Sequence, residues 1–209
     1  MNNVEGFVLA GGASSRMGKD KALLTLGGKT FVERAAFALR AVSQNLCLVG
    51  DNLKGEMFLP TAPDVHKIKA EKKRASIIGV HSALFHAQMQ WAAILACDLP
   101  FVTGELLTRL ADLGKIYEKS DLAAVVPIQP DGKIQPLCAF YKPAVCLPRI
   151  EEMLAARKFR LQEIFGKIKT KFVEFSEIAD LPNAKNFFFN VNTPEDLRRA
   201  EKIERRLIS

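Results

Sequence analysis

Short apolar runs alternate with segments of helical periodicity along most of the chain. Residues 7–10, 46–49 and 91–97 are almost entirely apolar, which is the pattern of strands buried on both faces of a sheet. Residues 31–42, between the first two runs, carry apolar side chains at helical spacing. A strand, a helix and a second strand within about fifty residues predict a parallel pair joined by a crossover helix.

Several predicted helices begin at residues that favour a helix start. Thr30 and Glu33 have the spacing of a capping box, and Thr103 is the expected N-cap of a helix over residues 103–113. Pro143 stands near the first position of a helix over residues 143–156. Further helices are predicted from residue 79 onward, at residues 161–165 and at residues 194–207.

The pattern of residues 121–141 predicts a pair of strands joined by a turn within the same sheet. Residues 121–126 and 134–141 read as extended segments, and Asp131 with Gly132 marks a turn between them. Other strands are predicted at residues 57–60, 171–175 and 187–191. The alternation of strands and helices predicts a doubly wound, mostly parallel, Rossmann-like α/β sheet with helices on both faces, in a single domain over residues 1–209.

A glycine-rich segment follows the first predicted strand. Gly11 and Gly12 permit a close backbone approach, and hydroxyl and cationic side chains follow at Ser14, Ser15, Arg16, Lys19 and Lys21. Free N–H groups and positive charge at a strand end suit an oligophosphate. The segment is not a P-loop, because five residues separate Gly12 from Gly18, and no G-x-G-x-x-G is present. A loop that is glycine-rich only for its turn geometry stays open.

An aspartate follows the most apolar predicted strand. Gly11, Asp51 and Asp98 each lie just beyond a strand end, so a parallel sheet would place them at one crevice. Asp98 comes after largely apolar residues and therefore needs a partner for its charge. A carboxylate at this position suits Mg²⁺, although a turn or N-cap aspartate would have the same pattern.

Composition limits the classes of partner. The formal net charge of +7 over 209 residues favours an anionic partner, but the basic residues are not interleaved with aromatic ones as in a single-strand nucleic-acid binder. The basic run at residues 67–74 reads as a solvated loop, with phosphate contact left open. The four cysteines are widely spaced, which disfavours zinc. Without a signal peptide or a long apolar stretch, a cytoplasmic protein without membrane or nucleic-acid partners is expected.

The run LAGGASSRMGKDK at residues 9–21 resembles the signature loop of nucleotidyltransferases that activate small molecules with a nucleoside triphosphate. It is most similar to that of the molybdenum cofactor guanylyltransferases. The resemblance implies transfer of GMP from GTP to molybdopterin with release of pyrophosphate, Mg²⁺ as cofactor, and an antiparallel strand late in the sheet. It leaves transient contacts with other proteins of molybdenum cofactor biosynthesis open.

The same resemblance assigns roles to residues of this chain. The implied catalytic residues are Lys21, Arg16 and Asp98, and Asp98 is the implied metal ligand. Nucleotide contacts are implied for Leu9, Ala10, Gly11, Gly12, Lys21, Asp64 and Asp98. Acceptor contacts are implied for Asn190, Asn192 and Gln135, and Asn amides suit the mixed donors and acceptors of a pterin edge. Thr193 can cap the following helix at the same time.

Two departures keep alternatives open. The family usually follows its second acid with G-P-L-x-G, whereas residues 75–79 read ASIIG, so the role of Asp64 is in doubt. A non-catalytic nucleotide-binding protein of the same fold is therefore one alternative. Transfer of a cytidylyl group, or transfer to another phosphorylated acceptor, is the second. Gly11 favours guanine, because the related cytidylyltransferases read LAAG at this point.

Overall fold

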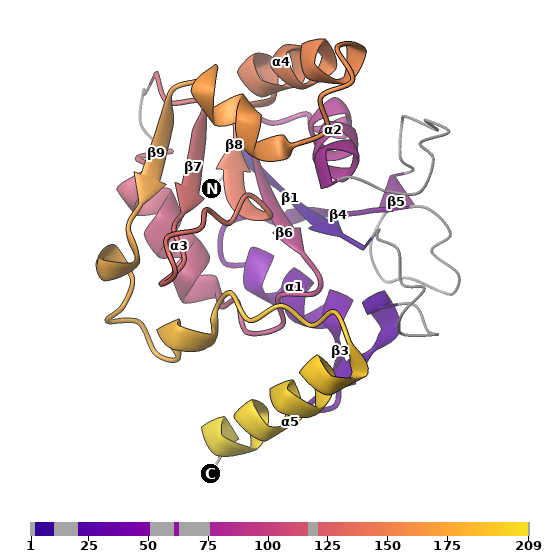
Figure 1. The fold of residues 1–209 in the computed structure, drawn as a ribbon, viewed down its shortest axis with the longest axis vertical. Helices are drawn as coiled ribbons and strands as arrows, with labels where there is room; N and C mark the ends of the chain where they lie inside the picture. The colour runs from indigo at the N-terminus through magenta and orange to yellow at the C-terminus, as the bar shows by residue number, and fades with distance from the viewer. Residues whose placement is uncertain (1–2, 11–20, 51–60, 63–75, 117–120, 209) are drawn as a thin grey trace.

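One mixed sheet organises the computed structural model, which describes residues 3–10, 21–50, 61–62, 76–116 and 121–208 (Figure 1). Among these residues seven strands form a sheet in the order β5-β4-β1-β6-β8-β7-β9. Their bounds are β1 Val4–Leu9, β4 Asn45–Val49, β5 Thr61–Ala62, β6 Trp91–Ala96, β7 Ala124–Pro127, β8 Cys138–Tyr141 and β9 Thr170–Val173. β8 is antiparallel to β6 and β7, and the other pairs are parallel. The predicted mostly parallel sheet with a late antiparallel strand is confirmed.

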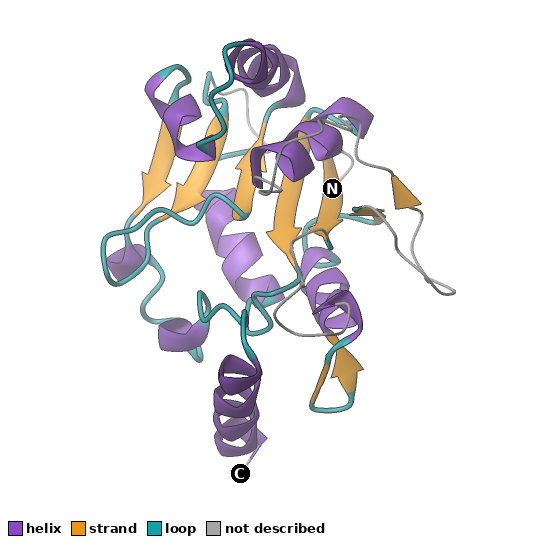
Figure 2. Cartoon of the chain, turned by 45° about the vertical axis from the view of Figure 1, so that its right-hand side comes forward, coloured by secondary structure: helices purple, strands orange, loops and turns teal. Residues whose placement is uncertain are grey.

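Helices cover both faces of this sheet (Figure 2). On one face lie α1 (Phe31–Leu39) and α3 (Gly104–Leu113), and on the other α2 (Ser76–His86) and α4 (Pro143–Ala155). The last helix, α5 (Pro194–Ile208), extends away from the sheet beside the small hairpin of β2 (Thr25–Leu26) and β3 (Lys29–Thr30) (Figure 1). None of the helices among the described residues is long and apolar enough to cross a membrane.

Strand β6 lies between the two halves of the hydrophobic core. Trp91 and Leu95 pack in the core under α1 and α3, whereas Ala92 and Ile94 pack in the core under α2 and α4. Every residue of the strand is buried. Because both faces are covered, the sequence shows a continuous apolar run instead of polar alternation.

The helix starts predicted at Thr30, Thr103 and Pro143 are confirmed, whereas the helix predicted from residue 79 begins earlier, at Ser76. The Thr30 hydroxyl accepts from the Glu33 N–H at 3.1 Å, and the Glu33 carboxylate accepts from the Thr30 N–H at 2.6 Å, which completes the capping box. Thr103 caps α3 by accepting from the Leu106 N–H at 3.3 Å. Pro143 is the first residue of α4, where the missing N–H costs nothing.

The prediction of a strand at residues 187–191 is wrong. The 3-10 helix η5 (Ala184–Asn186) leads into this segment, and the Phe187 and Phe189 N–H groups bond to carbonyls three residues earlier. Phe187 and Val191 are buried in the core under α1 and α3. The apolar run therefore indicates burial, while its backbone takes a turn instead of joining the sheet.

Other boundaries are shifted. The short helix near residue 161 is the 3-10 helix η3 (Leu161–Gly166). Within the predicted extended segment 134–141, only Cys138–Tyr141 forms a strand, and Ile134 makes an isolated bridge to Ile128. The strand predicted at residues 57–60 lies outside the described residues.

Replacing Gly104 should reveal how closely the start of α3 approaches the turn that follows α1. A Cβ atom at Gly104 would lie 2.7 Å from the Cβ of Ala41, and neither atom can move without the backbone. We expect Gly104→Ala to lower the free energy of unfolding by about 1–3 kcal/mol in urea titrations. Gly166→Ala is the matched control, because nothing lies within 4 Å of the added carbon. Equal stability of the two variants would contradict the close approach.

Candidate functional site

The carboxyl ends of β4, β1 and β6 meet at one edge of the sheet. Leu9 is in register with Val49 on one side and with Ala96 on the other. Just beyond the strands, the Ala10 N–H donates to the Val49 carbonyl at 2.9 Å and the Cys97 N–H donates to the Leu9 carbonyl at 3.1 Å. The chain therefore enters the glycine-rich segment beside the turn that carries Asp98.

Three segments that are distant in sequence bond to consecutive residues at the end of β6. The Ala96 N–H donates to the Leu137 carbonyl at 2.8 Å, and the Cys97 N–H donates to the Leu9 carbonyl. The Asp98 carbonyl accepts from the Val191 N–H at 2.9 Å. The first strand, the segment after Gln135 and the segment between Asn190 and Asn192 are thus brought together here.

Asp98 is half-buried in the turn that follows β6. Its neighbours Leu99 and Phe101 are buried, and the Leu99 N–H donates back to the Ala96 carbonyl at 3.3 Å. Burial of Leu99 and Phe101 fixes the turn, so the position of the carboxylate is set by the core below it. One carboxylate oxygen, Oδ1, is itself buried.

The two asparagines alternate with apolar anchors. Val191 is buried, and the ring of Phe189 meets the ring of Phe101 edge to face with 6.1 Å between centroids. Asn190 and Asn192 are exposed on either side of Val191. The segment is therefore fixed by its apolar side chains and presents its amides at the surface beside the Asp98 turn.

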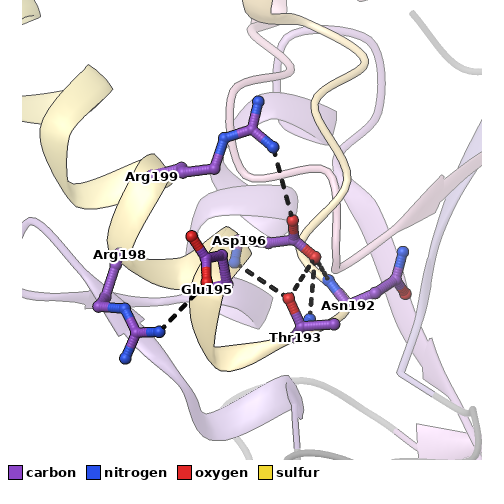
Figure 3. A network of polar contacts seen from close by, with 6 residues as sticks. All are labelled: Asn192, Thr193, Glu195, Asp196, Arg198 and Arg199. Carbon is purple, nitrogen blue, oxygen red and sulfur yellow. Dashed lines mark hydrogen bonds and ion pairs between the residues drawn. The ribbon is translucent and has the colours of Figure 1, made fainter.

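Asp196 fixes the backbone at Asn192 (Figure 3). Its Oδ2 accepts from the N–H of Asn192 at 3.1 Å, from the N–H of Thr193 at 3.0 Å and from the Thr193 hydroxyl at 2.9 Å. In return, the Asp196 N–H donates to the Thr193 hydroxyl at 3.1 Å. Burial raises the pKa of Asp196, but the hydrogen bonds from Thr193 and Asn192 outweigh it and lower that pKa overall. No role is predicted for Asp196 from the sequence, although Thr193 and Asp196 have the spacing of a capping pair.

Gln135 lies in the connection between β7 and β8. It is 8% exposed, its N–H donates to the Pro127 carbonyl at 2.9 Å, and its carbonyl accepts from the Cys138 N–H at 3.2 Å. The next residue, Pro136, accepts from the buried Tyr141 hydroxyl at 2.8 Å. These bonds hold the connection against the end of β6, where Leu137 bonds to Ala96.

The remaining expected residues are only partly described. Lys21 begins the 3-10 helix η2 (Lys21–Leu23), which precedes β2. Gly11, Gly12, Arg16, Asp51 and Asp64 lie outside the described residues, so their assignments stay predictions.

Asp98 is the described residue of this site that was expected to hold a metal ion. Among the described residues, no group of three or more His, Cys, Asp or Glu side chains could enclose a metal ion. Mg²⁺ keeps several waters and is commonly held by one or two carboxylates together with substrate phosphates. The half-buried carboxylate of Asp98 has the chemistry of such a ligand.

Comparison with known proteins agrees with the geometry. The sheet order and the convergence at the carboxyl end of β6 define an α/β protein of the nucleotidyltransferase fold. Residues 6–170 match the model of the MobA-like NTP transferase domain, and the chain belongs to this family.

Relatives of similar length span nearly the whole chain. A protein of Carboxydothermus hydrogenoformans named "Probable molybdenum cofactor guanylyltransferase" is 32% identical over 97% of this chain and 98% of its own. The molybdenum cofactor guanylyltransferase of Desulfosudis oleivorans is 30% identical, with 96% of each chain covered.

Solved structures share the fold. The molybdopterin-guanine dinucleotide biosynthesis protein A of Archaeoglobus fulgidus superposes with a TM-score of 0.77 at 25% identity, covering 97% of this chain and 99% of the other. The 2-C-methyl-D-erythritol 4-phosphate cytidylyltransferase of Thermus thermophilus has a TM-score of 0.62 at 16% identity, covering 95% and 98%. The second likeness concerns the fold alone.

The hydrogen bonds to Asp196 predict a contribution to stability in acid. Because its pKa is lower in the folded chain than in the unfolded one, ionised Asp196 stabilises the fold above the unfolded pKa, and this stabilisation is lost as the pH falls through the folded pKa. We expect the free energy of unfolding to fall more from about pH 5 to about pH 3 in the wild type than in Asp196→Asn. Urea titrations at the two pH values measure this fall. An equal fall in the free energy of unfolding in the wild type and in Asp196→Asn would contradict the prediction.

Proposed function

We propose that the chain transfers GMP from GTP to molybdopterin, forming the guanine dinucleotide cofactor and releasing pyrophosphate. The observation that carries the proposal is the convergence of three segments on residues 96–98 at the end of β6. The full-length similarity to guanylyltransferases supports the same reaction. The net charge of +7 also suits two anionic substrates.

The nucleotide side of the proposed site begins at the end of β1. The backbone of Leu9, Ala10, Gly11 and Gly12 would contact the base and ribose, and Asp64 would lie near the nucleotide. Arg16 and Lys21 would bind the phosphates and stabilise the charge that develops on the pyrophosphate as it leaves. Phosphoryl transfer asks little covalent chemistry of side chains, so holding the two anions in line is the main task.

Asp98 would hold Mg²⁺ as the family's cofactor. When bound, the ion supplies positive charge to the phosphate oxygens. The chain's own contribution is a carboxylate whose turn is fixed by buried Leu99 and Phe101. Asp98 is therefore assigned both a metal-binding and a catalytic role.

The acceptor would bind on the other side of the Asp98 turn. Asn190 and Asn192 present amide donors and acceptors there, and Gln135 belongs to the connection that bonds to Ala96 through Leu137. Amides match the mixed hydrogen-bonding edge of a pterin. The proposal includes a cytoplasmic location and transient contacts with other proteins of molybdenum cofactor biosynthesis, and it includes no nucleic-acid or membrane partner.

The decisive assay offers GTP, ATP, CTP and UTP separately, each with Mg²⁺ and molybdopterin. Pyrophosphate release is followed, and the product is identified by mass. We expect the guanine dinucleotide with GTP and little product with the other nucleotides. Product with CTP alone would show a cytidylyltransferase, and binding of GTP without any product would show a non-catalytic protein.

Two substitutions test the catalytic assignments. We expect Asp98→Ala and Lys21→Ala each to lower kcat by at least ~10²-fold, because each removes charge stabilisation in the transition state. Lys19→Ala is the control, because the family resemblance assigns a role to Lys21 and none to Lys19, so loss of Lys19 should leave kcat within about twofold. Unchanged turnover in both test variants would remove the assignment.

The acceptor assignment predicts a selective effect on one substrate. Asn190→Ala and Asn192→Ala should raise the KM for molybdopterin by about tenfold, the loss of roughly one net hydrogen bond, with the KM for GTP unchanged. Steady-state kinetics with each substrate varied in turn measures both constants. A rise in the KM for GTP alone would place these residues on the nucleotide side.

A further inference from the structure

The guanidinium of Arg34 joins four elements around the proposed site. From α1, its Nε–H donates to the Pro100 carbonyl at 2.9 Å, in the turn that follows Asp98. Its Nη1 donates to the Leu26 carbonyl at 3.1 Å, in β2 just after η2. The same guanidinium lies over the ring of Phe101, 5.9 Å from the centroid, within the range of a cation–π contact.

Glu204 completes the arrangement from the C-terminal helix. Its two oxygens accept from Nη1 and Nη2 of Arg34 at 2.7 Å and 3.1 Å, across 170 positions of sequence. The two side chains are only 19% and 14% exposed. A bidentate pair with this degree of burial fixes the guanidinium plane more firmly than an exposed ion pair would.

The hairpin between β2 and β3 is shaped to admit this carboxylate. Gly27 has a φ of +58°, and a Cβ atom there would overlap Oε1 of Glu204. The left-handed backbone conformation favours glycine at position 27, and an added Cβ atom would also force the Glu204 carboxylate to shift. The pair and the turn fit each other, although they come from opposite ends of the chain.

We propose that Arg34 and Glu204 are positioning residues for nucleotidyl transfer. This inference rests on the proposed function. Arg34 is bonded both to the turn that carries Asp98 and to the strand that follows the helix of Lys21, so it sets the spacing between the two groups assigned to the phosphates. Glu204 holds the orientation in which Arg34 reaches both carbonyls. Transfer between two bound anions is sensitive to such spacing, because a shift of about 1 Å can cost about 10²-fold in rate.

A purely structural ion pair would also stabilise the fold, so the test must separate rate from stability. The chain offers a matched control in Arg109 and Asp180, which form a bidentate pair at 3.1 Å and 2.8 Å. Arg109 likewise donates to a backbone carbonyl, that of Glu177, at 2.9 Å. This second pair joins α3 to the segment after β9. Its hydrogen bonds go neither to the turn of Asp98 nor to η2, the 3-10 helix that begins at Lys21.

The experiment compares Glu204→Gln and Arg34→Lys with Asp180→Asn. Each purified protein is assayed for thermal unfolding, and for kcat and both KM values at a temperature where it is fully folded. We expect kcat to fall about tenfold in Glu204→Gln and Arg34→Lys, with the KM for GTP within about twofold, because binding survives while alignment is lost. Asp180→Asn should keep the wild-type kcat although it breaks a pair of the same bidentate geometry, one whose side chains are more exposed at 34% and 63%.

A second variant guards against loss of the fold. The double substitution Arg34→Met with Glu204→Met removes both charges, and an apolar replacement of a partly buried pair often preserves stability. We expect it to unfold near the wild-type temperature yet to keep the low kcat, because Pro100 and Leu26 have lost their shared donor. Wild-type kcat in this variant, or in both single variants, would overturn the positioning role. An inactive wild-type protein would instead overturn the proposed function and this inference with it.

Discussion

The burial of β6 on both faces is the constraint from which the site follows. A strand enclosed by β1, β8 and four helices leaves no place for a charged side chain along its length, so polarity can begin only where the strand ends. Asp98 stands at that end, and the residues before it bond to Leu9 and Leu137 while its own carbonyl bonds to Val191. The backbone of the most buried strand is thus the reference against which the other site segments are placed.

Features decided by neighbouring residues could be predicted from the sequence. The capping box of Thr30 and Glu33, the cap at Thr103 and the buried runs at β1, β4 and β6 each depend on a few adjacent side chains. The order of strands and helices then fixed the fold class, and with it the edge at which Asp98 lies. The glycine-rich segment was identified by its composition and family likeness, which say nothing about its conformation.

Features decided by distant residues could not be predicted. The run around Phe187 has the composition of a strand, but the N–H groups of Phe187 and Phe189 bond to carbonyls in local turns. Its apolar side chains pack in the core. The apolar composition therefore indicated burial correctly and pairing with the sheet wrongly. Arg34 and Glu204 stand 170 positions apart, and nothing in either local pattern indicates the other. The positive φ of Gly27 is likewise explained by Glu204 only once the helix is in place.

Within the described seven-stranded sheet, β8 is the strand that runs antiparallel to its neighbours, and its direction explains how two kinds of connection reach one edge. At the carboxyl edge of parallel strands lie the residues that come directly after each strand, such as Ala10 after β1 and Asp98 after β6. Because β8 runs in the opposite direction, the residues that come just before it lie at this same edge. Leu137, which precedes β8, therefore bonds to Ala96 at the end of β6. The connection between β7 and β8 is held at the same edge at both ends, since the N–H of Gln135 bonds to the carbonyl of Pro127. Reversing β8 thus brings the connection between β7 and β8 to the edge where β1 and β6 end, beside Asp98.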